Sequence, residues 1–576
     1  MPSELLRRAS HPSFASRIAL TSRGGKDFTY ADLLAASRRL AVGLPSSALE
    51  ARGRAAPSHR HPGLVRDVPR LAVLAPPGPA YMAATLATWR VGGIAVPVAP
   101  GSPARDVEYV LADSGVSALL TTPELADQPG VREAASKLGA PLVLVDGRDD
   151  GEILGGAPDA AAEDMAALGR QSSLEARTGA AGDSGALIIY TSGTTGRPKG
   201  VLHSHGGLMA QMESLAAAWQ MSPSDRLLHV LPLHHIHGIV NALYLPLSIG
   251  ATVDFSASGS PFSPKRIWAR LCNPEPPVTV FMGVPTMYDM LATVHERGSS
   301  GSSPEERAAR SKAAAGLRLT VSGSSACPVP LMQRWRELSG GQTLLERYGM
   351  SEIGMALSNP YLEVDGRKRT PGAVGAPLPG VEVAIDGSRD SESGELLVRG
   401  PGIFAEYWNL PEKTAEAFTE DGFFRTGDTA RQLPGGAYQI LGRTSVDVLK
   451  CRGFKVSALA IEAVVLEHPA VAEVGRLVAE FNRPDRPQKA TNAPHLVQVA
   501  VIGLPDERDG QVVAAVIALK PDAAAVSGPE LTEWLRPRLP SHEVPKEYWF
   551  VPSVPRNAMG KVNKKDLYAA WQGRDK

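Results

Sequence analysis

Hydroxyl, glycine and lysine residues at positions 190–200 have the composition and order of a phosphate-binding loop. The segment reads Tyr-Thr-Ser-Gly-Thr-Thr-Gly-Arg-Pro-Lys-Gly and continues the apolar run 186–190. Glycines let backbone N–H groups approach phosphate oxygens closely, and the hydroxyls and Lys199 add donors and a positive charge. A Walker-type P-loop needs Gly-Lys-Ser/Thr at the start of a helix, whereas Lys199 stands between Pro198 and Gly200. The spacing therefore predicts a polyphosphate loop that is not of the P-loop kinase or NTPase type.

Six further blocks follow this loop in a fixed order. They occupy residues 231–238, 346–352, 407–409 with 411–414, 426–428, 442–443 and 555–561. In this order the blocks resemble the acyl-adenylate-forming (AMP-binding) superfamily, which comprises acyl-CoA synthetases, luciferases and peptide-synthetase adenylation domains. The resemblance covers close to the whole chain. It implies that the protein uses ATP and Mg²⁺, with coenzyme A as a co-substrate.

The resemblance implies a nucleotide site assembled from the loop and several later blocks. Tyr348 should lie against the adenine, and Asp428 should accept hydrogen bonds from the ribose hydroxyls. Glu352 should lie near Mg²⁺, a hard cation that suits oxygen ligands. The family usually has Thr where this chain has Ser351, and the hydroxyl is kept. The expected nucleotide-binding residues are Thr191, Ser192, Gly193, Thr194, Thr195, Gly196, Lys199, Gly323, Ser324, Ser325, Tyr348, Gly349, Met350, Ser351, Asp428 and Arg443.

Lys561 is the expected catalytic residue of the first reaction step, together with Glu352 and Thr191. It ends the run Pro-Arg-Asn-Ala-Met-Gly-Lys at 555–561. Negative charge gathers as a carboxylate oxygen attacks the α-phosphorus of ATP. A lysine that bridges carboxylate and phosphate oxygens stabilises that charge. The alternative interpretation of Lys561 is a solvated lysine in a basic tail.

Arg347, within the run Glu-Arg-Tyr-Gly-Met, bears on the choice of acid. Many relatives that take fatty or aromatic acids have an uncharged residue there, and this run resembles malonyl-CoA synthetases. A second substrate carboxylate must be desolvated in the acyl pocket, and a guanidinium offers it a matching charge and a bidentate fork. The alternative is that Arg347 forms a structural ion pair. The expected substrate-binding residues are Arg347, His237, His235, Ser322 and Met282.

The resemblance thus implies a ligase that forms malonyl-CoA from malonate through malonyl-AMP, with release of AMP and pyrophosphate. Methylmalonate or another short- to medium-chain acid is an alternative substrate, since one methyl group gives only about 1–3 kcal/mol of discrimination. An adenylating enzyme that does not use CoA and a non-catalytic nucleotide-binding module are two alternatives from other classes. Joint retention of the charged and polar motif residues argues against the last of these.

The elements that must position these residues alternate between strand-like and helix-like patterns. Residues 71–75 and 186–190 read as short buried strands, and residues 32–44 read as an amphipathic helix. Such alternation predicts an α/β protein. We expect a large N-terminal domain, residues 1–442, of α/β layers with a distorted barrel or sheets. Residues 443–576 should form a small mobile α+β domain that carries the catalytic lysine.

The boundary between these domains resembles the family hinge, about which the C-terminal domain rotates between the two reaction steps. The segment 443–447 is one residue longer than the family pattern, so the hinge is not assigned to a single position. A polar, proline-rich insertion at 476–497 separates two blocks that nearly adjoin in relatives. We expect this insertion to be a surface loop.

Overall charge and composition argue against other classes of partner. Sixty basic residues balance sixty acidic ones, whereas proteins held by nucleic acid or anionic lipid are usually basic. No apolar run is long enough to predict a membrane span, and the three cysteines fit no metal-ligand spacing. We therefore expect small-molecule substrates (malonate, ATP and CoA) and no obligate protein partner. The expected compartment is the cytoplasm, with the mitochondrion as the alternative because the first residues include several arginines.

Overall fold

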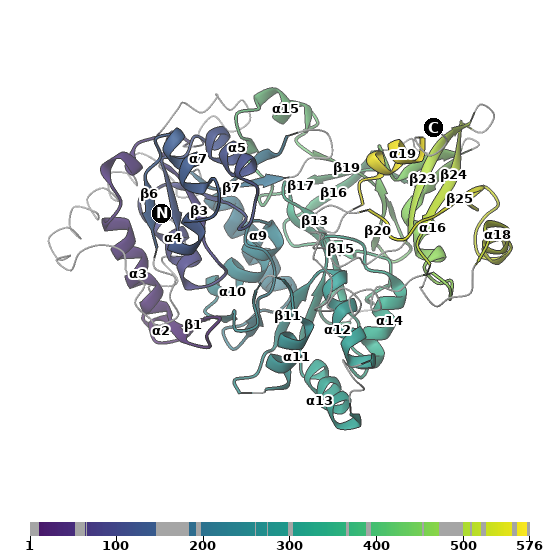
Figure 1. Ribbon diagram of the computed structural model, residues 1–576, viewed down its shortest axis with the longest axis horizontal. Coiled ribbons are helices and arrows are strands. Elements are labelled where there is room, and N and C mark those ends of the chain that lie inside the picture. Colours follow the sequence, from purple (N-terminus) through teal and green to yellow (C-terminus); the bar gives the residue numbers. More distant parts are fainter. Residues whose placement is uncertain are drawn as a thin grey trace.

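The computed structural model describes most of the chain. The described residues are 11–51, 64, 66–145, 184–191, 197–259, 261–273, 275–297, 303–363, 368–386, 393–451, 454–471, 499–506, 510–519, 526–555 and 562–572. Their strands form four sheets flanked by helices (Figure 1), which confirms the predicted α/β class. A closed barrel, one form that we allowed for the large domain, is not formed by these residues, because each sheet is open.

A seven-stranded sheet carries the two ends of the phosphate loop. Its order is β18-β8-β7-β4-β3-β5-β6, parallel except at β8 and β18. Its central strands are continuous apolar runs because helices cover both faces. The strands are β3 (Arg70–Leu74), β4 (Ile94–Pro97), β5 (Ala118–Thr121), β6 (Leu142–Leu144), β7 (Gly185–Thr191), β8 (Lys199–Ser204) and β18 (Glu406–Tyr407). Neighbouring helices include α3 (Tyr30–Val42), α4 (Pro79–Arg90), α5 (Ala104–Ser114) and α7 (Val131–Lys137).

A nine-stranded sheet carries most of the other motif residues, in the order β15-β14-β13-β12-β11-β9-β10-β1-β2. Its strands are β1 (Ile18–Thr21), β2 (Asp27–Thr29), β9 (Arg226–Leu228), β10 (Thr252–Asp254), β11 (Val280–Gly283), β12 (Leu319–Ser322), β13 (Leu345–Met350), β14 (Gly354–Ser358) and β15 (Ala376–Pro377). Helices α11 (Pro264–Cys272), α12 (Pro285–Arg297), α13 (Pro304–Ala315) and α14 (Val329–Leu338) follow its strands in sequence.

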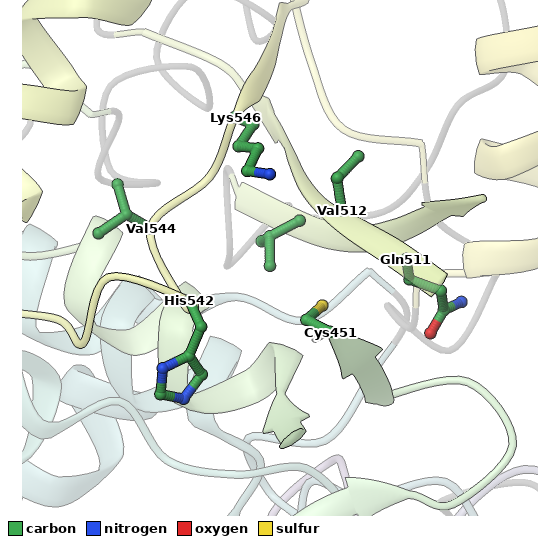
Figure 2. Close-up of a pocket in the computed structure, with 7 residues that line it drawn as sticks. Cys451, Gln511, Val512, His542, Val544 and Lys546 are labelled. Atoms are coloured by element: carbon green, nitrogen blue, oxygen red, sulfur yellow. The ribbon is translucent and has the colours of Figure 1, made fainter. Parts of the chain in front are cut away.

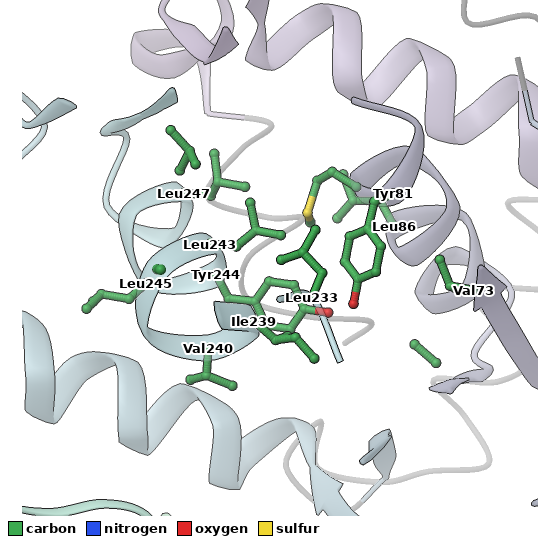
Figure 3. Packing of buried hydrophobic residues seen from close by; sticks show 14 of the residues in the cluster. Val73, Tyr81, Leu86, Leu233, Ile239, Val240, Leu243, Tyr244, Leu245 and Leu247 are labelled. Atoms are coloured by element: carbon green, nitrogen blue, oxygen red, sulfur yellow. The ribbon is translucent and has the colours of Figure 1, made fainter. Parts of the chain in front are cut away.

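A single apolar core joins these two sheets. Helix α9 (His205–Ala218), the π-helix His237–Tyr244 and α10 (Leu245–Ser248) contribute to it. Figure 3 shows apolar side chains of the π-helix, such as Leu243 and Tyr244, beside Tyr81 of α4. Burial of the apolar side chains of this shared core is the main force that fixes the two sheets relative to each other. Motif residues at the ends of their strands are held in place by this packing.

Two smaller sheets complete the molecule. The first has the order β16-β17-β19-β20, and the second contains β21 to β25 and has its own apolar core. Their strands are β16 (Glu382–Asp386), β17 (Ser393–Arg399), β19 (Phe424–Gln432), β20 (Tyr438–Arg443), β21 (Val448–Cys451), β22 (Phe454–Ser457), β23 (Val499–Asp506), β24 (Gly510–Ile517) and β25 (Glu547–Phe550). The second sheet is accompanied by α16 (Ala458–Val465), α18 (Gly528–Leu535) and α19 (Lys564–Gln572).

The predicted division of the chain falls at the end of β20. Residues 444–447 link β20 to β21, where the second small sheet begins (Figure 1, right side). The division at 442/443 stays a prediction. The insertion 476–497 lies outside the described residues. Where the chain is described, its helices are too short or too polar for any to cross a membrane.

Candidate active site

The adenine and ribose part of the expected nucleotide site is built from β13, β19 and β20. Tyr348 on β13 donates its hydroxyl hydrogen to Asp428 Oδ2 on β19 at 2.6 Å. Arg443, the partner of Asp428 across β19 and β20, has its Nε 2.9 Å from Asp428 Oδ1. Burial and the Asp428 carboxylate raise the pKa of Tyr348, so the phenol stays a hydrogen-bond donor. Three residues far apart in the sequence thus form one hydrogen-bonded group.

Glu352, the residue expected near Mg²⁺, lies in the turn that follows β13. Its Oε1 accepts a hydrogen bond from the Tyr407 hydroxyl at 2.9 Å, and its carbonyl accepts one from Phe404 N–H at 2.7 Å. Across the described ranges there is no group of three or more His, Cys, Asp or Glu that could hold a metal ion. A single carboxylate fits Mg²⁺, which takes one or two protein carboxylates and completes its shell with water and substrate phosphates.

The phosphate loop is described at its two ends. Thr191 ends β7, Lys199 begins β8, and the two residues are paired across these antiparallel strands. Lys199 Nζ lies 4.6 Å from the centroid of the Tyr407 ring. The remaining loop residues and the expected catalytic lysine lie outside the described residues; they are Ser192, Gly193, Thr194, Thr195, Gly196 and Lys561.

Arg347 lies on β13 with 4% of its surface exposed. Its guanidinium rests against Gly323, where an added Cβ would meet Arg347 Cζ at 2.3 Å, so the guanidinium has room only because residue 323 is glycine. Nε and Nη2 have no hydrogen-bond partner among the described residues. Burial lowers the pKa of Arg347, and the nearby Glu346 opposes that shift. A buried charged group without a partner is costly to fold.

His237 and Ser322 present further unpartnered polar atoms near this guanidinium. His237 Nδ1 lies 3.2 Å from Ser324 Oγ, and Ser324 adopts a left-handed backbone conformation with φ of 70°. His237 Nε2 and the Ser322 hydroxyl have no partner in the described part of the chain. Burial, and secondarily the Arg347 charge, lowers the pKa of His237 well below its ordinary value, so its ring is neutral. Ser322 ends β12 next to β13, directly before Gly323.

Two other residues expected in the acyl pocket, Met282 and His235, lie in the apolar core and beside other histidines. Met282 lies on β11 and packs within the apolar core between the sheets. His235 has its ring 4.2 Å from that of His234. Its charge is one of the smaller effects that lower the pKa of His237, so the two histidines are neighbours. His235 is thus a neighbour of His237, whereas Met282 belongs to the apolar core.

The remaining expected nucleotide residues lie on β13, in the turn after it, or just after β12. Gly349 and Met350 complete β13 and are half-buried, and Ser325 is exposed just after β12. The Ser351 carbonyl lies 2.8 Å from Nε2 of the buried His203, so this ring nitrogen carries the hydrogen. Gly349, Met350 and Ser351 thus follow Tyr348 directly in the chain.

Comparison with protein families shows which enzyme family this chain belongs to. The family model described as AMP-binding enzyme matches residues 7–408, and that described as AMP-binding enzyme C-terminal domain matches residues 488–561. This chain belongs to the AMP-binding enzyme family.

Individual members of the AMP-binding enzyme family match over nearly the whole chain. A probable CoA ligase, CCL8, of Humulus lupulus is 37% identical over 98% of this chain and 91% of its own length. The mitochondrial malonate–CoA ligase ACSF3 of Xenopus laevis is 39% identical over 96% of this chain and 90% of its own length.

Two solved structures of AMP-binding enzymes have the same fold. ATP-bound MatB from Rhodopseudomonas palustris superimposes with a TM-score of 0.77 at 29% identity, covering 99% of both chains. A malonyl-CoA ligase in a ternary product complex with methylmalonyl-CoA and AMP gives a TM-score of 0.59 at 33% identity, covering 96% of this chain and 100% of that one.

Two residues that the motifs did not assign lie beside expected site residues or on the same helix as one of them. Tyr407 was only part of a motif block, and it contacts both Lys199 and Glu352. Asn241, one turn after His237 on the π-helix, is fully buried, and neither amide atom has a partner among the described residues. A polar residue inside the apolar run 239–245 was the available signal for Asn241, since buried amides normally find partners.

A small recess in the C-terminal sheet is too small for any substrate. Its volume is 10 Å³, which holds about one water molecule. Cys451 Sγ, His542 and Lys546 surround it, as Figure 2 shows. The recess is therefore not a candidate for the acyl or nucleotide pocket.

Proposed function

We propose that this AMP-binding enzyme is an AMP-forming acid–CoA ligase whose acid is malonate. In the first step a malonate carboxylate oxygen attacks the α-phosphorus of ATP, and pyrophosphate leaves. In the second step the CoA sulfur attacks the acyl carbonyl of malonyl-AMP, the thiol proton is lost, and AMP leaves. Named malonate–CoA ligases among the relatives support this choice of acid.

The observation that carries the choice of acid is the unpartnered side of the Arg347 guanidinium. Nε and Nη2 form one edge of the guanidinium, and both N–H groups on that edge lack partners within the described residues. Such an edge matches the two oxygens of a carboxylate. The far carboxylate of malonate would accept hydrogen bonds from these two nitrogens and would neutralise the positive charge of Arg347. A monocarboxylate would leave this buried cation uncompensated.

The competing interpretation, an ion pair between Arg347 and Glu346, has less support. The two are consecutive on β13, and consecutive side chains of a strand point to opposite faces. Glu346 Oε1 instead accepts a hydrogen bond from Cys327 N–H at 2.8 Å. No ion pair of Arg347 occurs among the described residues, so its charge is available to a ligand.

Other unpartnered polar atoms suit the same substrate. The neutral His237 Nε2 and the Ser322 hydroxyl are buried near Arg347. Asn241 lies on the same side of the π-helix as His237, because residues four apart on a helix are neighbours. We assign these three residues to the polar lining of the acyl pocket. A short acid with a second polar end fits such a lining better than a fatty acid does.

For the nucleotide we propose the roles that the motifs indicate. Tyr348 lies against the adenine, the Asp428 carboxylate accepts from the ribose hydroxyls, and Lys199 contacts the phosphates. Glu352 would hold Mg²⁺, which when bound neutralises charge on the phosphates. Lys561 remains the proposed catalytic residue of the first step. The compartment remains a prediction, the cytoplasm or the mitochondrion.

Pyrophosphate release from the wild-type enzyme tests the proposal. Malonate, methylmalonate, acetate and hexanoate are each supplied with MgATP, with and without CoA. We expect malonate to give the highest kcat/KM and malonyl-CoA to form only when CoA is present. Higher kcat/KM for a monocarboxylate would contradict the choice of acid. Full turnover without CoA would indicate the adenylating class, and no acid-dependent release would indicate a nucleotide-binding module.

A further inference from the structure

One tyrosine joins the phosphate-loop lysine to the proposed metal-binding carboxylate. The Tyr407 hydroxyl donates to Glu352 Oε1 at 2.9 Å, while Lys199 Nζ lies 4.6 Å from the centroid of the same ring. The Glu352 carboxylate thus contacts the phenol hydroxyl, and the Lys199 ammonium group contacts the ring of the same tyrosine. Tyr407 is buried, with 7% of its surface exposed.

The position of this tyrosine is fixed by several contacts to its backbone and ring. On β18, Tyr407 is paired with Val201 of β8, two residues after Lys199. Its backbone N–H donates to Thr414 Oγ1 at 3.0 Å, and its ring centroid lies 4.8 Å from that of Phe404. Phe404 N–H in turn holds the Glu352 carbonyl at 2.7 Å. The segment that carries Tyr407 therefore holds both the backbone and the side chain of Glu352.

The protonation state of Tyr407 suits this arrangement. The Tyr407 hydroxyl is the donor in its 2.9 Å contact with Glu352, because an ionised carboxylate can only accept. A neutral ring attracts a lysine ammonium through its π-electrons, with an energy of only about 0.5–1 kcal/mol at exposed sites. The ring is therefore a weak partner of Lys199 that a phosphate can replace, whereas the hydroxyl can go on holding Glu352 when a metal ion binds.

Lys199 and Glu352 carry opposite charges and contact the same tyrosine side chain. A direct ion pair between them would have to break before either could bind a phosphate or a metal ion, which costs binding energy. Among the described residues Lys199 forms no ion pair with Glu352. The phenol hydrogen bond is accepted by Oε1 of Glu352, and a carboxylate has further lone pairs that can coordinate a hard cation.

We propose that Tyr407 is a positioning residue for MgATP, which keeps Lys199 and Glu352 apart and oriented before the nucleotide arrives. Removal of its hydroxyl should weaken metal binding through Glu352, because hydrogen-bond partners of metal ligands set the orientation of those ligands. Removal of the ring should also weaken the contact of ATP with Lys199. The inference rests on the proposed use of ATP but not on the identity of the acid.

The test compares Tyr407→Phe, which keeps the ring, with Tyr407→Leu, which does not. ATP affinity is measured by calorimetry without any acid, first without divalent cation and then over a series of Mg²⁺ concentrations. For Tyr407→Phe we expect unchanged metal-free affinity and a rise of about tenfold in the Mg²⁺ concentration needed for half-maximal enhancement. For Tyr407→Leu we expect the same rise and, in addition, metal-free affinity about threefold weaker.

Tyr548→Phe is the matched control, since its hydroxyl lies 2.9 Å from Thr532 Oγ1 in the C-terminal sheet region. This variant should bind ATP and Mg²⁺ as the wild type does. A wild-type Mg²⁺ dependence in Tyr407→Phe would overturn the proposal, whatever the melting temperature of the variant. Because no acid is present, an error in the choice of malonate leaves these measurements unaffected. Absence of ATP binding by the wild type would instead refute the proposed function itself.

Discussion

At the scale of single residues, charge and burial decide what the site can bind. Tyr348, Asp428 and Arg443 satisfy one another, so this part of the site is complete before a nucleotide arrives. Arg347 and His237, in contrast, leave polar atoms unpartnered within the described structure. Buried polar groups normally find partners, which supports the proposal that these atoms contact a bound substrate. The side chains proposed to contact the ribose are already paired with one another, whereas those proposed to contact the acid still have unpartnered polar atoms.

Burial of Glu346 predicts a pH-dependent stability. Burial raises the pKa of this carboxyl from 4.5 to about 7. Between these values the unfolded chain is ionised while the folded protein keeps the proton, so stability falls as pH rises through this window. Glu346→Gln removes the titration and keeps the acceptor for Cys327 N–H. We expect the melting temperature of this variant, relative to wild type, to be higher at pH 8 than at pH 5.

Thermal unfolding of both proteins at the two pH values measures this difference. An equal offset at pH 5 and pH 8 would show that the Glu346 pKa is not raised in the folded protein.

At the scale of elements, local patterns predicted most of the strands and helices that carry the motifs. Residues 71–75 and 186–190 were expected as strands and correspond to β3 and β7. The helix expected at 32–44 begins slightly earlier, at Tyr30, because Thr29 and Asp32 form a capping box. The π-helix at His237–Tyr244 was not predicted, since a run buried on all sides has no amphipathic period. Sheet closure likewise depends on distant pairing, which local patterns do not contain.

Helix α19 is attached to the rest of the C-terminal region by a buried group of charges. Lys564 Nζ lies 2.6 Å from Asp447 Oδ1 and 2.7 Å from Glu462 Oε1. Lys564→Met keeps the length of the side chain but leaves the buried Glu462 and the half-buried Asp447 without this counter-charge. Loss of one partner of a buried ion pair costs about 3–5 kcal/mol. We therefore expect a large drop in the denaturant midpoint of the C-terminal region.

Lys565→Met is the control for this change, because Lys565 is exposed on the same helix. Denaturant unfolding followed by tryptophan fluorescence reads out the loss, since Trp571 and Trp549 are in edge-to-face contact nearby. Similar midpoints for the two variants would show that the charge group does not stabilise α19.

At the scale of the whole molecule, motifs that are distant in sequence meet because two large sheets share one core. The motif blocks predicted a set of nucleotide-binding residues, but not how the protein connects them. Tyr407 shows why: its role depends on pairing of β18 with β8, two strands about two hundred residues apart. Asn241 was missed for a related reason, since its lack of partners is visible only after the surrounding core is built.

Arg347→Met is the most direct test of whether a buried guanidinium selects a dicarboxylic acid. The measurement is kcat/KM for malonate and for acetate in the wild type and the variant, with ATP affinity measured alongside. We predict that kcat/KM for malonate falls about 100-fold or more, since a buried charge pair is lost. We also predict that kcat/KM for acetate does not fall and that ATP affinity stays unchanged. Retained malonate turnover in the variant would contradict the account.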